Sequence, residues 1–283
     1  MRLVKSFIRL VLSSMRLLVR KYIKLWQTFF TNSLTREMEF KANFISHILV
    51  DLIYYFSLYL FYYVIFQYTD QIGDFNKETV IIFMIVTYMI DAIFEFFFSS
   101  NIGSFNTMIV KGNLDFILTK PVNSQFLISL RYVGFNGLVS FSILLILLFS
   151  LANNYPHGNI TYLNYILFFL SFIMGCIIWY CIDFMIHCLS FWFKNFSVAG
   201  WLSSNMLQFS KRPDTIYFGF LRRILFSFIP MAMVASVPVR FLIYGASAGL
   251  DLFIIQILIC ISFYALSRYV WLKSLVKYES ASS

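Results

Sequence analysis

MIVKGNLDFILTKPVN, residues 108–123, is an island of mixed polarity in an otherwise apolar chain. Gly112-Asn113 ends any helix that precedes it, because both residues tolerate turn conformations that others resist. Pro121 ends the segment that follows, and it biases Lys120 toward an extended backbone. The stretch therefore predicts a short helix between two turns.

The apolar residues of this short helix share one face. Leu114, Ile117 and Leu118 lie three and four positions apart, and Asp115 and Lys120 lie off their face. A short amphipathic helix between membrane spans is suited to docking against another protein. Residues 108–123 are therefore predicted to be a docking segment.

Composition indicates a membrane protein. Hydrophobic residues make up 60% of the 283 positions and charged residues only 12%, and the mean hydropathy is +0.78. About a quarter of a soluble domain is charged, so a soluble globular domain is excluded. The 35 Phe and 18 Tyr predict a surface rich in aromatic side chains facing lipid and the membrane interface. The net charge of +9 is therefore interpreted through membrane topology and not as nucleic-acid binding.

Motifs for catalysis and metal binding are missing from the sequence. The four Cys lie in apolar runs without metal-ligand spacing, and the three His are scattered. The chain contains no phosphate-binding loop of the G-x-x-x-x-G-K-[ST] type and no Ser-His-Asp arrangement. We therefore expect neither an enzyme nor a bound cofactor or metal on this chain, and any ATP hydrolysis must come from another subunit.

Residues 1–41 predict a basic amphipathic helix that lies in the membrane interface. Five basic residues share one helical face, and apolar side chains fill the other: Arg2, Lys5, Arg9, Arg16 and Arg20. A targeting peptide is the alternative, but the chain continues directly into a membrane domain.

Residues 42–283 predict a single all-α membrane domain with six transmembrane helices. The first predicted span, residues 44–66, is long enough for the roughly 20 residues that a bilayer core requires. Pro230 and Pro238 interrupt the fifth apolar segment, which predicts a short span followed by a re-entrant element between the fifth and sixth spans. The predicted spans are residues 44–66, 80–100, 133–151, 162–186, 224–238 and 250–272.

The distribution of Lys and Arg predicts the orientation. With residues 101–132 and 187–223 assigned to the cytoplasmic side, 20 of the 22 basic residues lie inside, and only Lys77 and Arg240 lie outside. Basic residues concentrate in cytoplasmic loops, so both termini are expected in the cytoplasm.

Four acidic residues within the predicted spans are candidate functional residues: Asp51, Asp91, Glu95 and Asp183. Charges at this depth are costly and often functional, so a polar vestibule or a proton relay is one interpretation. The other, which we favour, is that they make hydrogen bonds and salt bridges between helices, with Arg222 or Arg223 as partners.

A family resemblance rests on the order of several short motifs. After the second span the chain has a glycine-x-leucine-aspartate, leucine, basic-proline pattern, formed by Gly112, Leu114, Asp115, Leu118, Lys120 and Pro121. A second patch combines Arg212-Pro213, Tyr217, Arg222-Arg223, Ile229-Pro230 and Pro238. In this order the chain resembles the permease subunit of a bacterial ATP-binding-cassette type-2 (ABC-2) exporter.

The resemblance implies a permease that pairs with an identical or sister copy in the bacterial cytoplasmic membrane. A separate cytoplasmic ATPase subunit, which carries the ATP and Mg²⁺, is then expected to dock on residues 108–123. The docking residues implied are Lys111, Gly112, Leu114, Asp115, Ile117, Leu118, Lys120 and Pro121. The N-terminal helix becomes an interfacial elbow.

Two other functions fit the same residues. A proton-coupled carrier or channel acting alone would use Asp51, Asp91 and Glu95. A membrane-embedded enzyme would need a catalytic cluster at one interface, for which Asp183 and His187 are the candidates.

Overall fold

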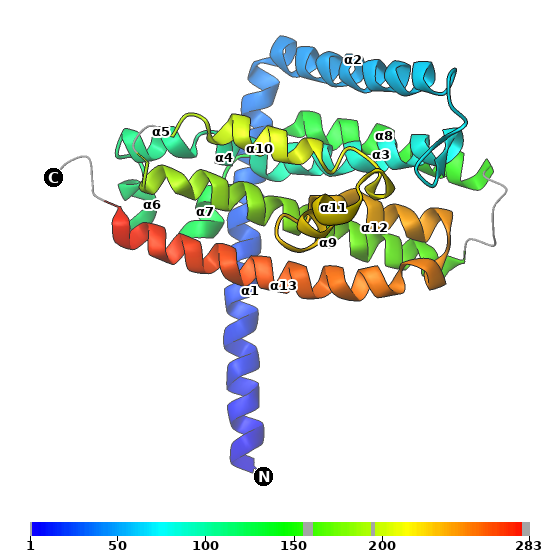
Figure 1. The fold of residues 1–283 in the computed structure, drawn as a ribbon. Coiled ribbons are helices and arrows are strands. Elements are labelled where there is room, and N and C mark those ends of the chain that lie inside the picture. The colour runs from blue at the N-terminus through cyan, green and yellow to red at the C-terminus, as the bar shows by residue number, and fades with distance from the viewer. Residues whose placement is uncertain (1, 155–160, 194–195, 279–283) are drawn as a thin grey trace.

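The computed structural model describes residues 2–154, 161–193 and 196–278. In this part of the chain, helices form a bundle of roughly parallel elements, and α1 (Arg2–Glu39) crosses the bundle steeply (Figure 1). The long helices of the bundle are α2 (Lys41–Ile65), α3 (Lys77–Phe94), α8 (Phe135–Asn154), α9 (Tyr162–Cys188), α12 (Met231–Ile243) and α13 (Ala246–Lys277).

Helix α9 lies at the centre of the packing, against α12, α13, α3 and α10 (Ala199–Gln208). Every residue of α12 except Arg240 is buried, as expected for a helix that is apolar around its whole circumference. The four cysteines are free and buried.

Two glycines allow helix backbones to approach closely. A Cβ atom at Gly175 of α9 would lie 2.4 Å from the carbonyl oxygen of Val234 in α12. A Cβ atom at Gly137 of α8 would lie 2.4 Å from the carbonyl oxygen of Ala92 in α3. At both crossings only glycine fits without moving a backbone.

The lengths and compositions of the helices support an all-α membrane protein. Four described helices are long and apolar enough to cross a membrane: Lys41–Ile65, Lys77–Val110, Tyr162–Phe191 and Gly249–Lys277. Two bent pairs raise the number to as many as six: Ser124–Leu130 with Phe135–Leu151, bent by 70°, and Gly219–Ser227 with Met231–Ile243, bent by 85°.

The bundle has two distinct ends (Figure 1). One, the α6 end, holds the end of α13 and four short helices: α4 (Ser100–Gly103), α5 (Phe105–Val110), α6 (Asp115–Leu118) and α7 (Ser124–Leu130). The other, the hairpin end, holds the turn between α12 and α13 and two antiparallel strands, β1 (Gln71–Ile72) and β2 (Phe75–Asn76).

Residues 199–218 differ from the sequence-based expectation of a cytoplasmic connection. Helix α10 packs on α9, and the chain after it reaches the hairpin end, where the Asp74 amide donates to the Thr215 hydroxyl at 3.2 Å. Lys211, Arg212, Arg222 and Arg223 therefore lie away from the α6 end, because they follow α10 toward the β-strands. The basic residues of 101–132 and after Ser267 belong to elements at the α6 end, and Lys21 of α1 contacts Pro121 there.

The expected fifth span, residues 224–238, is divided between two helices. Helix α11 (Gly219–Ser227) meets α12 at 85°, and Pro230 is the residue before α12, at the bend. Pro238 lies inside α12, which continues to Ile243, so the predicted break there is wrong.

Candidate functional site

Residues 108–123 fold as two turns around the one-turn helix α6. Gly112 has φ of +71°, the left-handed region that favours glycine, and it ends α5. The amide of Leu114 donates to the carbonyl of Met108 at 3.3 Å and closes this turn. The Gly-Asn interruption expected from the sequence is present.

The apolar face of α6 points into this chain's own core. Leu114 is 0% exposed and Ile117 is 5% exposed, and both pack in a cluster with Phe105, Phe184 and Trp271. Leu118 is partly buried against the same cluster. The shared face was predicted correctly, but Leu114 and Ile117 are unavailable to a partner in this structure.

The outward face of the segment carries different residues. Phe116 is 72% exposed, and Lys111, Lys120 and Pro121 are also exposed. Sequence reasoning did not single out Phe116 as an exposed residue of this segment. Its position off the apolar face was the available signal, because a large aromatic side chain there has no place in the core.

Helix α7 connects this segment to two spanning helices. The Tyr180 hydroxyl of α9 lies 2.8 Å from the Ser129 hydroxyl and 3.3 Å from the Gln125 side-chain amide. From α13, Arg268 donates to Gln125 at 3.2 Å, and the Trp271 indole donates to the Ser124 hydroxyl at 3.2 Å. A displacement of α7 therefore acts directly on α9 and α13.

Helix α1 braces the same segment from the other side. The Lys21 ammonium donates to the carbonyl of Pro121 at 2.9 Å, and the amide of Asn123 donates to the Tyr22 hydroxyl at 3.1 Å. Farther along, the amide of Val133 donates to the buried Ser33 hydroxyl at 3.1 Å. The N-terminal helix thus contacts the predicted docking segment at several points.

The last described residue also contacts this region. Burial raises the pKa of the Tyr278 hydroxyl to about 12, and the negative charge of Asp115 nearby adds to the shift. The ring of Tyr278 packs edge-on against Phe191 at 5.8 Å. The end of α13 is therefore held beside α6.

Three of the four intramembrane acids come together in a second site. Asp91, Glu95 and Asp183 line a cavity of about 350 Å³ between α3, α9 and α10, which we call the acidic cavity. Asp51 does not line this cavity, and its carboxylate accepts a hydrogen bond from Ser140 of α8 at 3.0 Å. The other lining residues are Phe94, Ser99, Ile102, Gly103, Trp179, His187, Gly200, Ser203, Ser204 and Leu207.

A stretch of π-helix, Glu95–Ser99, forms one wall of the acidic cavity. Such wide turns are rare and occur frequently at functional sites. Gly134 lies close enough to the carbonyl of Glu95 that a Cβ atom would come within 2.9 Å of it. The neighbouring chain therefore packs tightly against the backbone that positions the Glu95 side chain.

The acids of the cavity differ in their partners. Asp91 forms an ion pair of 2.7 Å with Lys211, and Asp183 accepts from the Ser203 hydroxyl and lies 3.4 Å from the His187 ring. The Glu95 carboxylate forms no hydrogen bond or ion pair with any residue in the described ranges. Hydrogen bonds and ion pairs to other parts of the chain therefore account for the Asp91 and Asp183 carboxylates. The cationic partner of Asp91 is Lys211, and not Arg222 or Arg223 as expected.

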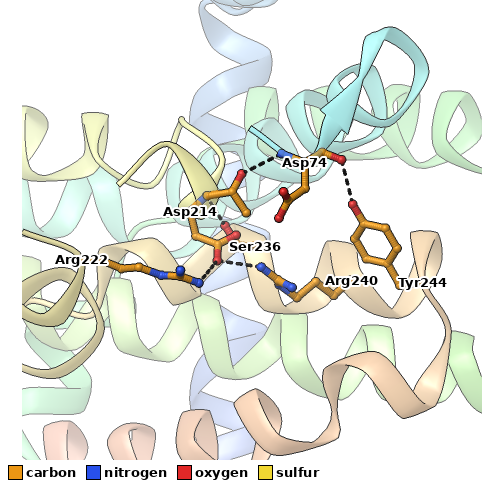
Figure 2. Close-up of polar contacts among 7 residues, drawn as sticks. Asp74, Asp214, Arg222, Ser236, Arg240 and Tyr244 are labelled. Atoms are coloured by element: carbon orange, nitrogen blue, oxygen red, sulfur yellow. Dashed lines mark hydrogen bonds and ion pairs between the residues drawn. The ribbon is translucent and has the colours of Figure 1, made fainter. Parts of the chain in front are cut away.

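Arg222 belongs instead to a buried cluster near the hairpin end. Asp214 is 0% exposed, and its carboxylate forms ion pairs with Arg240 at 2.7 Å and Arg222 at 3.6 Å (Figure 2). The amide of Asp214 also bonds to the Ser236 hydroxyl at 3.3 Å, and Tyr244 donates to the carbonyl of Asp74 at 3.1 Å. Sequence reasoning missed Asp214 because its segment was assigned to the cytoplasm.

Comparison with known families decides the class of the protein. A family model described as ABC-2 family transporter protein matches residues 52–282, most of the chain. The chain belongs to the ABC-2 transporter family. The matched part of this ABC-2 permease runs from within α2 through α13 and contains both the docking segment and the acidic cavity. No curated protein and no solved structure matches the chain.

Proposed function

We propose that the chain is the permease subunit of an ABC exporter and is driven by a separate cytoplasmic ATPase subunit. The family match over residues 52–282 carries this proposal. In support, the sequence contains no nucleotide-binding motif, as expected if a separate subunit hydrolyses the ATP.

The exposed face of residues 108–123 is the proposed ATPase-docking surface. Phe116 supplies an exposed apolar anchor on α6, and the exposed residues Lys111, Lys120 and Pro121 belong to the same segment. A central aromatic anchor with a polar rim is the usual arrangement of a protein interface. Leu114 and Ile117 pack in the core of this chain, where they hold α6 in place, and they do not contact the ATPase.

Coupling then follows the hydrogen bonds of α7. Movement of the ATPase shifts α6 and α7, and Tyr180, Arg268 and Trp271 transmit the shift to α9 and α13. Helix α1 is the interfacial elbow in this mechanism, since Lys21 and Tyr22 hold it against the docking segment.

The proposed topology places the α6 end in the cytoplasm of a bacterium, with both termini on that side of the inner membrane. Three basic residues in 101–132 and three after Ser267 belong to elements at this end, and Lys21 of α1 contacts Pro121 there, in agreement with the positive-inside rule. A second permease copy, identical or sister, would supply the other half of the pathway.

Association with the ATPase tests the proposal. The Phe116→Asp variant should bind the ATPase at least about tenfold more weakly, because a buried Phe contributes roughly 1.5–3 kcal/mol. Tyr68→Asp is the matched control, since Tyr68 is 86% exposed but precedes the hairpin at the opposite end. Equal co-purification of both variants with the ATPase would rule out this docking surface.

Transport in proteoliposomes separates this function from a carrier acting alone. The proposal expects substrate movement only when ATPase and ATP are both present. Movement by the permease alone, driven by a proton gradient, would support the stand-alone carrier instead.

A further inference from the structure

We propose that the acidic cavity binds an organic ammonium group carried by an amphipathic cargo. This inference rests on the proposed export function and names the chemical class of its substrate. The cavity lies between α3, α9 and α10, with a volume of about 350 Å³, large enough for a cationic head group with several attached carbons.

The charge of the cavity favours a cation. Its walls carry three carboxylates, while the cationic partners are Lys211, already paired with Asp91, and His187, bonded near Asp183. Glu95 remains without a protein partner in the described ranges. A carboxylate in a partly buried site is costly without a counter-charge, and an ammonium group supplies one.

The walls also suit an organic ligand. Trp179 is 2% exposed, and its indole nitrogen has no hydrogen-bond partner although it is buried. Buried donors are normally paired, so this one points to a ligand that carries an acceptor near its ammonium group. Phe94 and Trp179 provide aromatic faces that attract cations.

A metal ion is a poor alternative occupant. In the residues that the structure describes, no group of three or more His, Cys, Asp or Glu side chains is arranged to hold a metal. The acids instead line a cavity whose volume is several times that of a single ion. Apolar residues such as Ile102 and Leu207 also line it. An ion with an attached carbon skeleton uses both kinds of wall.

The cavity has an accessible border. Gly103 and Gly200 both line it, and a Cβ atom at either position would meet nothing within 4 Å. Gly200 and Ser204 are exposed on α10. A side chain added at Gly200 therefore fits at the border of the cavity without displacing protein atoms.

Tryptophan fluorescence of the purified full-length chain in dodecylmaltoside tests the site. N-hexylpyridinium, a cation that quenches indole fluorescence, is the probe, and hexanol and hexanoate are its neutral and anionic counterparts. We expect saturable quenching by the cation alone, and we expect Trp179→Phe to abolish the saturable component.

Two variants and their matched controls locate the binding. Glu95→Gln should weaken binding of the probe about tenfold or more, as expected for loss of an opposite charge close to the pyridinium ring, and Glu78→Gln at the hairpin end should not. Gly200→Phe should block binding, while Gln208→Phe, an exposed position of α10 outside the lining, should not.

Competition identifies the source of the ammonium group. Relief of quenching by phosphatidylethanolamine assigns the site to a lipid head group, and relief by hexylamine alone assigns it to a soluble amine. Non-saturable quenching, or equal affinity in wild type, Glu95→Gln and Gly200→Phe, would overturn the inference. ATPase association of the same variants should equal wild type, so a failure here is separate from a failure of the docking proposal.

Discussion

Asp214 is fully buried, and its carboxylate forms an ion pair with the guanidinium of Arg240 at 2.7 Å (Figure 2). This ion pair joins the chain after α10 to the last turns of α12. It thereby fixes the bent α11–α12 element near the hairpin end, where irregular backbone must be held by protein contacts.

Replacing Arg240 should destabilise the permease strongly. Arg240→Gln leaves a buried carboxylate with only the half-exposed Arg222 at 3.6 Å, and removing one member of a buried pair costs about 3–5 kcal/mol. Thermal unfolding of the variant in detergent measures this loss. Arg223→Gln is the control, because Arg223 is exposed and should change stability by no more than about 0.5 kcal/mol.

The Asp91–Lys211 pair should behave as a coupled unit. Lys211→Met leaves the Asp91 carboxylate without its 2.7 Å partner and should be strongly destabilising. The double variant Asp91→Asn, Lys211→Met should recover part of that loss, since no uncompensated charge remains. Additive effects in this double-mutant cycle, measured by detergent unfolding, would contradict the pairing.

Gly175 should tolerate no side chain. Gly175→Ala places a methyl group 2.4 Å from the Val234 carbonyl and should cost about 1–3 kcal/mol through separation of α9 and α12. Gly103→Ala, where the new methyl meets no atom within 4 Å, is the paired comparison and should leave the melting temperature unchanged or raise it. Equal melting temperatures for the two variants would argue against the close helix crossing.

Leu114 should act as a core residue. Leu114→Ala removes a fully buried side chain and should destabilise by about 2–5 kcal/mol, whereas Val110→Ala, at a position 50% exposed, should be nearly neutral. Unfolding in detergent without the ATPase separates this effect from docking. If Leu114→Ala weakened ATPase binding while the isolated permease kept its stability, Leu114 would be a contact residue after all.

Local patterns in the sequence determined much of the structure. Composition required an all-α membrane protein, because a chain this apolar can satisfy its backbone in lipid through helices. The Gly112-Asn113 turn was also predictable, because glycine readily adopts the left-handed conformation found there. The spacing of Leu114, Ile117 and Leu118 correctly placed them on one face.

Tertiary packing decided what those patterns could not. Helical spacing shows that residues share a face, but only the position of Phe105 and Trp271 turns that face inward and leaves Phe116 exposed. The path of residues 199–218 through the bundle depended on partners distant in the sequence, Asp74 and Asp91.

The residues of the acidic cavity were likewise identified partly from the sequence and partly from the tertiary structure. The sequence alone identified Asp91, Glu95 and Asp183 as costly charges within apolar segments. That they surround one cavity, with Asp51 left outside it, depends on how α3, α9 and α10 pack and on the π-helical turn at Glu95. Hydropathy is a local property of the chain, whereas a binding site is formed by groups that only folding brings together.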